Sequence, residues 1–163
     1  TLPRYTLDFQ LTREYADKGW NPWTPPIGLY YALQAALHLH KQRGLKDLQH
    51  HHETLMTTVR AGLNKQGLKL LVTDDAYASR AVTPVYPPTG VDADQLRSHL
   101  LERYNITLGG GQRQLTGQIF RVGHLGYQDI AGVQGVLHCI GKGIEHFQSS
   151  CSSGSETPAL SAS

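Results

Sequence analysis

The sequence is poor in the features that mark several specialised classes of protein. It has two cysteines, Cys139 and Cys151, in a pattern that forms neither a disulfide framework nor a metal-binding pair. Charged residues make up 17% of the chain and hydrophobic residues 39%, a balance unlike that of a charge-rich disordered protein. We therefore expect 163 residues to form one folded domain of ordinary size in a reducing compartment.

Long apolar runs and a strong net charge are also absent. No window approaches the roughly 20 apolar residues of a membrane helix, and the first ten residues lack the pattern of a signal peptide. Fifteen Lys and Arg against thirteen Asp and Glu leave a net charge of +2, with the cations scattered singly. These absences argue against a membrane or a nucleic acid as partner. The chain opens without methionine, which indicates processing or a piece of a longer protein.

Hydrophobic periodicity and turn residues divide the chain into helices and strands. A short helix over 4–18 is followed by a loop at 19–28 with three prolines and two tryptophans. The later predicted helices cover 27–44, 45–67, 91–104 and 130–147, and the predicted strands cover 68–72, 81–86, 105–108 and 118–122. This order predicts an α+β fold, in which a small antiparallel sheet has helices packed on one face.

Histidines and glycines suggest two kinds of site that the spacing does not support. Nine histidines include His38, His40 and the run 50–52, but metal ligands on a helix need to lie three or four residues apart on one face. We interpret them as a solvated helix face, with no metal site. The glycine-rich loop Gly109–Gly117 lacks the Lys-Ser or Lys-Thr of a phosphate-binding loop. We expect it to provide flexibility or close backbone approach.

Arg121 is the candidate binding residue. It lies at the centre of an apolar strand, where a guanidinium is costly to bury unless it meets an anion. Its planar fork suits a bidentate carboxylate. The pattern leaves two sources of that carboxylate open, a ligand and one of the thirteen acidic residues of the chain.

Longer segments around these residues match a known family. The segment IFRVGHLG, preceded by VDADQLRSHLLERYNITLGGG and LGGGQRQLTGQ, resembles the C-terminal domain of class V, fold-type I pyridoxal-phosphate aminotransferases, in the alanine–glyoxylate and serine–glyoxylate group. The segment NPWTPPIGLYYALQAAL resembles the family's loop into its interdomain helix. The resemblance covers about residues 5–144. It implies the end of a large domain over 1–43 and a small C-terminal domain over 44–148, before a low-complexity tail at 149–163 that we expect to be disordered.

The resemblance also implies roles for three residues. Arg121 matches the arginine that holds the substrate carboxylate. Thr24 matches a residue whose hydroxyl reaches the cofactor phosphate of the partner subunit in a homodimer, and Asn21 takes the place of a tyrosine that often faces the same phosphate. An alternative for Thr24 is to cap the helix that follows it. His124 and the loop Gly109–Gly111 would be structural neighbours of the site.

The implied reaction is transamination with pyridoxal phosphate, from alanine or serine to glyoxylate or pyruvate. The Schiff-base lysine of the family lies upstream of the matched region, and none of the six lysines here matches it. We therefore expect no catalytic residue in this chain. Two alternatives stay open: a non-catalytic dimerisation or carboxylate-binding domain, and a related class V lyase.

Two further expectations concern the environment of the chain. The C-terminal Ala-Ser does not resemble a peroxisomal address; we expect a cytoplasmic location, with the peroxisome or an organelle left open. The helix 27–44 should present an apolar surface that the absent domain would cover, which predicts self-association of the isolated chain.

Overall fold

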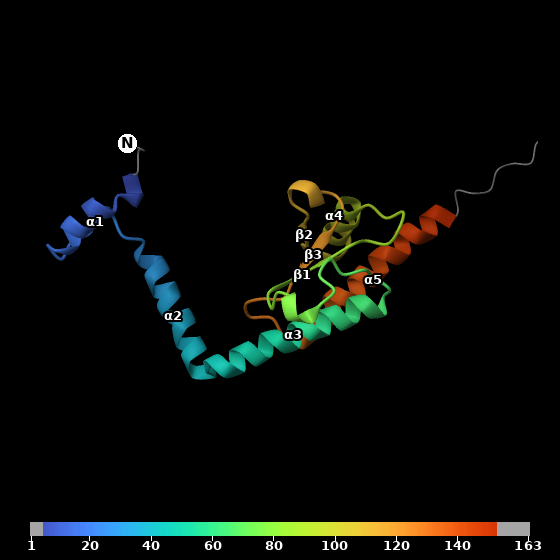
Figure 1. The fold of residues 1–163 in the computed structure, drawn as a ribbon, viewed down its shortest axis with the longest axis horizontal. Coiled ribbons are helices and arrows are strands. Elements are labelled where there is room, and N and C mark those ends of the chain that lie inside the picture. Colours follow the sequence, from blue (N-terminus) through green and yellow to red (C-terminus); the bar gives the residue numbers. More distant parts are fainter. Residues whose placement is uncertain (1–4, 153–163) are drawn as a thin grey trace, which may run out of the picture. The chain divides into compact units, whose positions relative to one another are not determined.

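The computed structural model describes residues 5–152, which divide into two compact units between Leu45 and Lys46 (Figure 1). The first unit contains helices α1 (Phe9–Ala16) and α2 (Ile27–Arg43), and the second contains helices α3 (Leu45–Lys65), α4 (Ala93–Tyr104) and α5 (Ile130–Ser152) with strands β1 (Val82–Val85), β2 (Gly109–Gly110) and β3 (Phe120–Gly123). Over residues 5–152, no helix combines the length and hydrophobicity needed to cross a bilayer.

The first unit follows the sequence prediction closely. Asp8 caps α1 by accepting hydrogen bonds from the backbone N–H groups of Gln10 and Leu11, at 3.1 and 3.0 Å. The proline-rich segment separates α1 from α2, because proline cannot donate the backbone hydrogen bonds that would continue a helix. Helix α2 ends at Gly44, which has a φ of +86°. No residue of α2 is buried within its own unit.

The second unit is built around a three-stranded antiparallel sheet with strand order β1-β3-β2. The register pairs Thr83 with Val122 and Val85 with Phe120, and all four of these residues are buried. Because successive side chains of a strand point to opposite faces, Arg121 lies on the other face, which is only partly buried.

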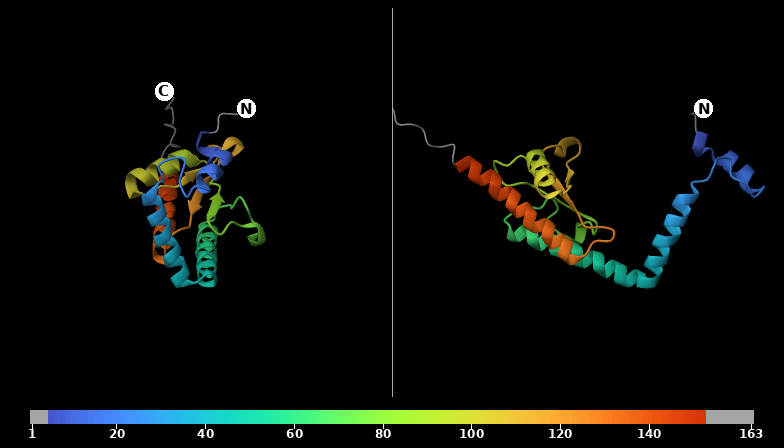
Figure 2. Two further views of the ribbon diagram at one scale, coloured as in Figure 1. Left: turned by 90° about the vertical axis from the view of Figure 1, so that its left-hand side faces the viewer. Right: turned by 180° about the vertical axis from the view of Figure 1, so that it is seen from behind.

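Helices α3, α4 and α5 cover the buried face of the sheet with one apolar core. Helices α3 and α5 run side by side, as the views of Figures 1 and 2 agree. Their close approach depends on Gly62, where a Cβ would collide with Leu137, and α4 approaches α5 at Gly143, where a Cβ would lie 2.9 Å from Leu96. The core is formed by Leu55, Val59, Leu63, Val85, Leu96, Leu100, Phe120, Val122, Val133, Leu137, Ile140 and Ile144. The α+β prediction is therefore confirmed.

Two predicted strands were wrong. The segment 68–72 forms only an isolated bridge between Leu70 and Val85. The segment 105–108 is not a strand because Asn105 takes the left-handed conformation that ends α4, with a φ of +55°. Pairing with β3 begins at Gly109 instead, inside the expected loop.

The C-terminal end also differs from expectation. Helix α5 continues to Ser152, past the predicted end near residue 147. The first residues of the expected tail at 149–163 are therefore helical, while 153–163, like 1–4 and the side chain of Cys151, lie outside the described residues.

Candidate functional site

Arg121 projects from the middle of β3 on the face of the sheet opposite the core. Its side chain is half-buried, and its Nε–H donates a hydrogen bond to the carbonyl oxygen of Gly110 at 2.8 Å. Within residues 5–152, no carboxylate pairs with this guanidinium, and its two terminal nitrogens make no hydrogen bond. A planar fork with free donors is thus held in place on this face.

The three consecutive glycines at 109–111 lie close to Arg121, Arg97 and Leu115, respectively. A Cβ on Gly109 would lie 3.2 Å from Nε of Arg121, and a Cβ on Gly110 would lie 2.8 Å from Nη1 of Arg97. A Cβ on Gly111 would collide with the carbonyl group of Leu115. The glycine run therefore permits close approach of two arginines and one tight turn, as the sequence predicted in general terms.

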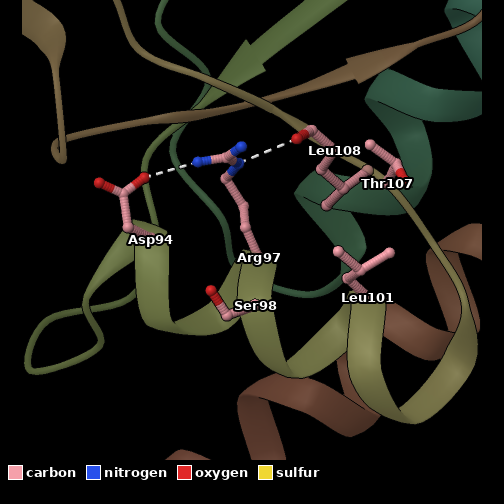
Figure 3. A pocket seen from close by; sticks show the side chains of 6 residues that line it. All are labelled: Asp94, Arg97, Ser98, Leu101, Thr107 and Leu108. Atoms are coloured by element: carbon pink, nitrogen blue, oxygen red, sulfur yellow. Dashed lines mark hydrogen bonds and ion pairs between the residues drawn. The ribbon is translucent and has the colours of Figure 1, made fainter.

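Arg97 was not found from the sequence. It reaches from α4 to the segment before β2, where its Nε–H donates to the carbonyl oxygen of Leu108 at 2.9 Å. Its Nη1 donates to Oδ1 of Asp94 at 2.7 Å, and Figure 3 shows the guanidinium between these two acceptors. The only sequence signal was an Asp and an Arg three residues apart on a helix, a common pattern on solvated surfaces.

His124 is fully buried directly after β3. Its ring Nε2 shares a hydrogen bond of 2.9 Å with the hydroxyl of Thr83, and its backbone N–H donates to the carbonyl oxygen of Ala81 at 2.9 Å. Burial lowers the pKa of His124, and the nearby charge of His52 lowers it further, against backbone hydrogen bonds that raise it. His124 therefore fastens the end of β3 to β1, as a structural neighbour of Arg121.

The other histidines do not gather into a metal site. His51 bonds to the carbonyl oxygen of Gln128 at 2.8 Å, and His99 stacks on His146 with ring centroids 4.4 Å apart. Among the residues that the structure describes, no three His, Cys, Asp or Glu side chains are placed to hold a metal ion.

Arg60 is a buried charge that, like Arg97, was not found from the sequence. Arg60 on α3 is 5% exposed and pairs with Asp75 at 2.6 Å. It also donates to the carbonyl oxygens of Val72 and Thr73, at 3.0 and 3.1 Å. All three guanidinium nitrogens of Arg60 therefore make hydrogen bonds to the loop before β1, whereas the terminal nitrogens of Arg121 make none within the described residues.

Asn21 and Thr24 lie in the first unit, in a proline-rich turn. Both side chains line a hollow of about 220 Å³ with Trp23, whose ring lies 4.1 Å from that of Tyr5. Both are exposed, and neither makes a side-chain hydrogen bond within the described residues. Pro26 occupies the cap position of α2 and makes no side-chain bond, so the alternative role of Thr24 as helix cap is wrong. The hydroxyl of Thr24 and the amide of Asn21 are therefore accessible to solvent in the described part of the chain.

All six lysines are exposed. Lys142 donates to Glu145 at 2.8 Å, and this hydrogen bond raises the pKa of Lys142. A Schiff-base lysine needs the opposite, a lowered pKa in a desolvated pocket. The lysines are Lys18, Lys41, Lys46, Lys65, Lys69 and Lys142.

Comparison with known proteins adds independent information. No family model matches the chain. A soluble hydrogenase small subunit from Synechococcus sp. is 40% identical over 143 residues, which cover 86% of this chain and 37% of that protein. The serine–glyoxylate aminotransferase of Methylorubrum extorquens is 35% identical over 125 residues, which cover 77% of this chain and 31% of the relative. The chain thus spans about a third of the length of these relatives.

Two of the solved structures that match the chain are, like the Methylorubrum relative, glyoxylate aminotransferases. The crystal structure of an alanine–glyoxylate aminotransferase from Nostoc sp. matches with a TM-score of 0.81 and 31% identity, covering 88% of this chain and 38% of that one. A ureidoglycine–glyoxylate aminotransferase from Bacillus subtilis matches with a TM-score of 0.69 and 28% identity, covering 72% and 30%. Both structures are glyoxylate aminotransferases.

Proposed function

The chain belongs to the class V pyridoxal-phosphate aminotransferases, over the third of their length that it spans, and we propose its function on that basis. It forms part of an enzyme that transfers an amino group from alanine or serine to glyoxylate or pyruvate. Relatives that are named for transfer to glyoxylate or pyruvate support this substrate class.

The observation that carries the proposal is the free fork of Arg121. All four proposed substrates have a carboxylate next to the reacting carbon, so one arginine serves both half-reactions. Two parallel N–H···O bonds from its terminal nitrogens would fix the carboxylate in one plane. The hydrogen bond from Nε to Gly110 already orients the guanidinium, so little side-chain freedom is lost on binding.

Asn21 and Thr24 are proposed to hold the phosphate of pyridoxal phosphate in the active site of a partner subunit. Their free amide and hydroxyl donors fit the acceptor oxygens of a phosphate. When bound, the cofactor supplies the electron sink for amino-group transfer. The lysine that holds it is expected outside this chain, because the lysines here are exposed.

A homodimer is part of the same proposal. Helix α2 exposes seven large hydrophobic side chains, each between 48% and 68% accessible within its unit. An apolar surface of this kind is typical of an interface. These residues are Ile27, Leu29, Tyr30, Tyr31, Leu33, Leu37 and Leu39.

The proposal is tested by measuring the binding of a carboxylate to the chain. The chain is titrated with pyruvate, and NMR gives the dissociation constant. We expect Arg121→Ala to weaken pyruvate binding roughly 10- to 100-fold, because hydrogen bonds to charged groups contribute about 1.5–3 kcal/mol. The matched control is Arg103→Ala, which removes an exposed arginine near the end of α4. L-Alaninamide should bind much more weakly than L-alanine. Equal pyruvate binding by Arg121→Ala and wild type would refute the role of Arg121.

The reading frame upstream of Thr1 separates an enzyme from a non-catalytic carboxylate-binding domain. A lysine that follows a predicted strand a few tens of residues before Thr1 supports the aminotransferase. A start codon near Thr1 supports the non-catalytic domain. Amino transfer from alanine to glyoxylate by the complete gene product is the direct assay.

A further inference from the structure

We propose that Arg97, fixed by Asp94, is a positioning residue that orients the fork of Arg121 through strand β2. The inference rests on the proposed function, since it concerns the arginine assigned to the substrate carboxylate. Arg97 itself lies on the other side of β2 and has no assigned contact with substrate.

Strand β2 is held by the two arginines from opposite faces. It is only two residues long and lies at the edge of the sheet, where β3 is its one neighbour. The carbonyl oxygen of Leu108 accepts from Arg97 at 2.9 Å, and that of Gly110 accepts from Arg121 at 2.8 Å. The two guanidinium groups thus donate hydrogen bonds to carbonyl oxygens that could otherwise accept them from a further strand.

Glycine makes β2 dependent on these contacts. Gly109 and Gly110 have no side chains that would anchor the strand in the core, and glycine gains the most freedom when its contacts are lost. The guanidinium of Arg121 lies against Gly109, and that of Arg97 lies against Gly110. A shift of β2 would therefore move the acceptor that aligns Arg121.

The position of Arg97 is in turn fixed by the start of α4. Asp94 accepts from Nη1 of Arg97 at 2.7 Å, and Asp92 caps the helix by accepting from the backbone of Asp94 and Gln95, at 3.0 and 2.8 Å. Leu96, beside Arg97 in the sequence, is fully buried in the core. Asp94 and Arg97 thereby connect the first turn of α4 to Leu108 beside β2 (Figure 3). The hydrogen bond between Gly110 and Arg121 continues this connection.

The test measures hydrogen exchange of the Arg121 Nε–H by NMR, without ligand. In Arg97→Ala we expect this exchange to accelerate about tenfold, and the dissociation constant for pyruvate to rise several-fold. Arg97→Lys should recover part of the protection, because its ammonium can donate to Leu108. Asp94→Asn, which keeps the side-chain shape but removes the charge, should give an intermediate effect. Arg103→Ala is the control with no expected effect.

The readouts separate positioning from general destabilisation. Positioning predicts faster exchange at Arg121 Nε–H while the backbone amides of buried residues such as Leu100 and Ile140 keep their wild-type rates. Acceleration in equal proportion at the core, or no change at Arg121 in both Arg97→Ala and Asp94→Asn, overturns the inference. Absence of pyruvate binding by the wild type would refute the proposed function alone, because the exchange measurement needs no ligand.

Discussion

Replacing Gly109 with alanine tests how closely Arg121 depends on the backbone beneath it. The new Cβ would lie 3.2 Å from Nε of Arg121 and 3.4 Å from both its Cβ and Nη2. The distance of 3.2 Å to Nε is shorter than an ordinary van der Waals contact, so the guanidinium must move by a few tenths of an ångström. Such a shift lengthens the 2.8 Å hydrogen bond to Gly110 and turns the fork away from its resting direction.

The expected magnitude separates binding from stability. The tip of an arginine is flexible, so the steric cost to folding should be about 0.5–1.5 kcal/mol, comparable to a side chain held off its rotamer. The smaller entropy of the unfolded alanine variant offsets about 0.4–1 kcal/mol of this cost. We therefore expect the free energy of unfolding to change by less than about 1 kcal/mol, while loss of an aligned charged hydrogen bond weakens pyruvate binding roughly tenfold.

The assay combines urea denaturation with a pyruvate titration of the same samples. The matched control is Gly135→Ala in α5, where a Cβ meets no atom within 4 Å. This control should stabilise the protein by about 0.5–1 kcal/mol through helix propensity and leave binding unchanged. Wild-type pyruvate affinity in Gly109→Ala would refute the reasoning that this glycine sets the orientation of Arg121.

Three further predictions concern other parts of the chain. Burial lowers the pKa of His124 below its ordinary value of about 6.5, so the free energy of unfolding should fall as the pH decreases below that value. In urea titrations between pH 7 and 5, His124→Gln should show a smaller fall in this free energy than the wild type. Leu33→Glu together with Leu37→Glu should reduce the mass found by light scattering, and a wild-type monomer would contradict the interface on α2. Borohydride reduction with equimolar pyridoxal phosphate should not label any one lysine stoichiometrically, as peptide mass spectrometry would show.

Local sequence signals were sufficient to place the helices, apart from the C-terminal end of α5. Asp92 marked the start of α4 and Gly44 the end of α2, because capping and left-handed conformations depend on the residues at those positions. The apolar residues that recur on α3 and α4 became the core of the second unit. These features are decided within a few residues along the chain.

The short strands depended on contacts that are distant in sequence. Ile106 and Thr107 have high strand propensity, but the pairing with β3 falls on two glycines, which have low propensity. The carbonyl oxygens beside and within β2 also accept hydrogen bonds from Arg97 and Arg121, eleven residues away in each case. Single-residue preferences do not report such contacts.

The sequence predicted only part of the candidate site, because some of its contacts are also distant in sequence. Arg121 was conspicuous as a charge in an apolar strand, and the described carboxylates leave its fork free. Arg97 was not conspicuous, because a helical Asp–Arg pair three residues apart occurs on many solvated surfaces. The assignments of Asn21 and Thr24 depend on family resemblance, and the structure adds that their side chains are exposed.

The arginines against β2 also bear on the solubility of the chain. An uncovered sheet edge is a template on which a strand from another molecule can add, and such addition leads to aggregation. Here bulky cations sit at the edge carbonyl oxygens of Leu108 and Gly110, and an incoming strand would have to displace them. Besides the binding and positioning roles proposed for them, we expect these two side chains to disfavour intermolecular β-pairing at this edge.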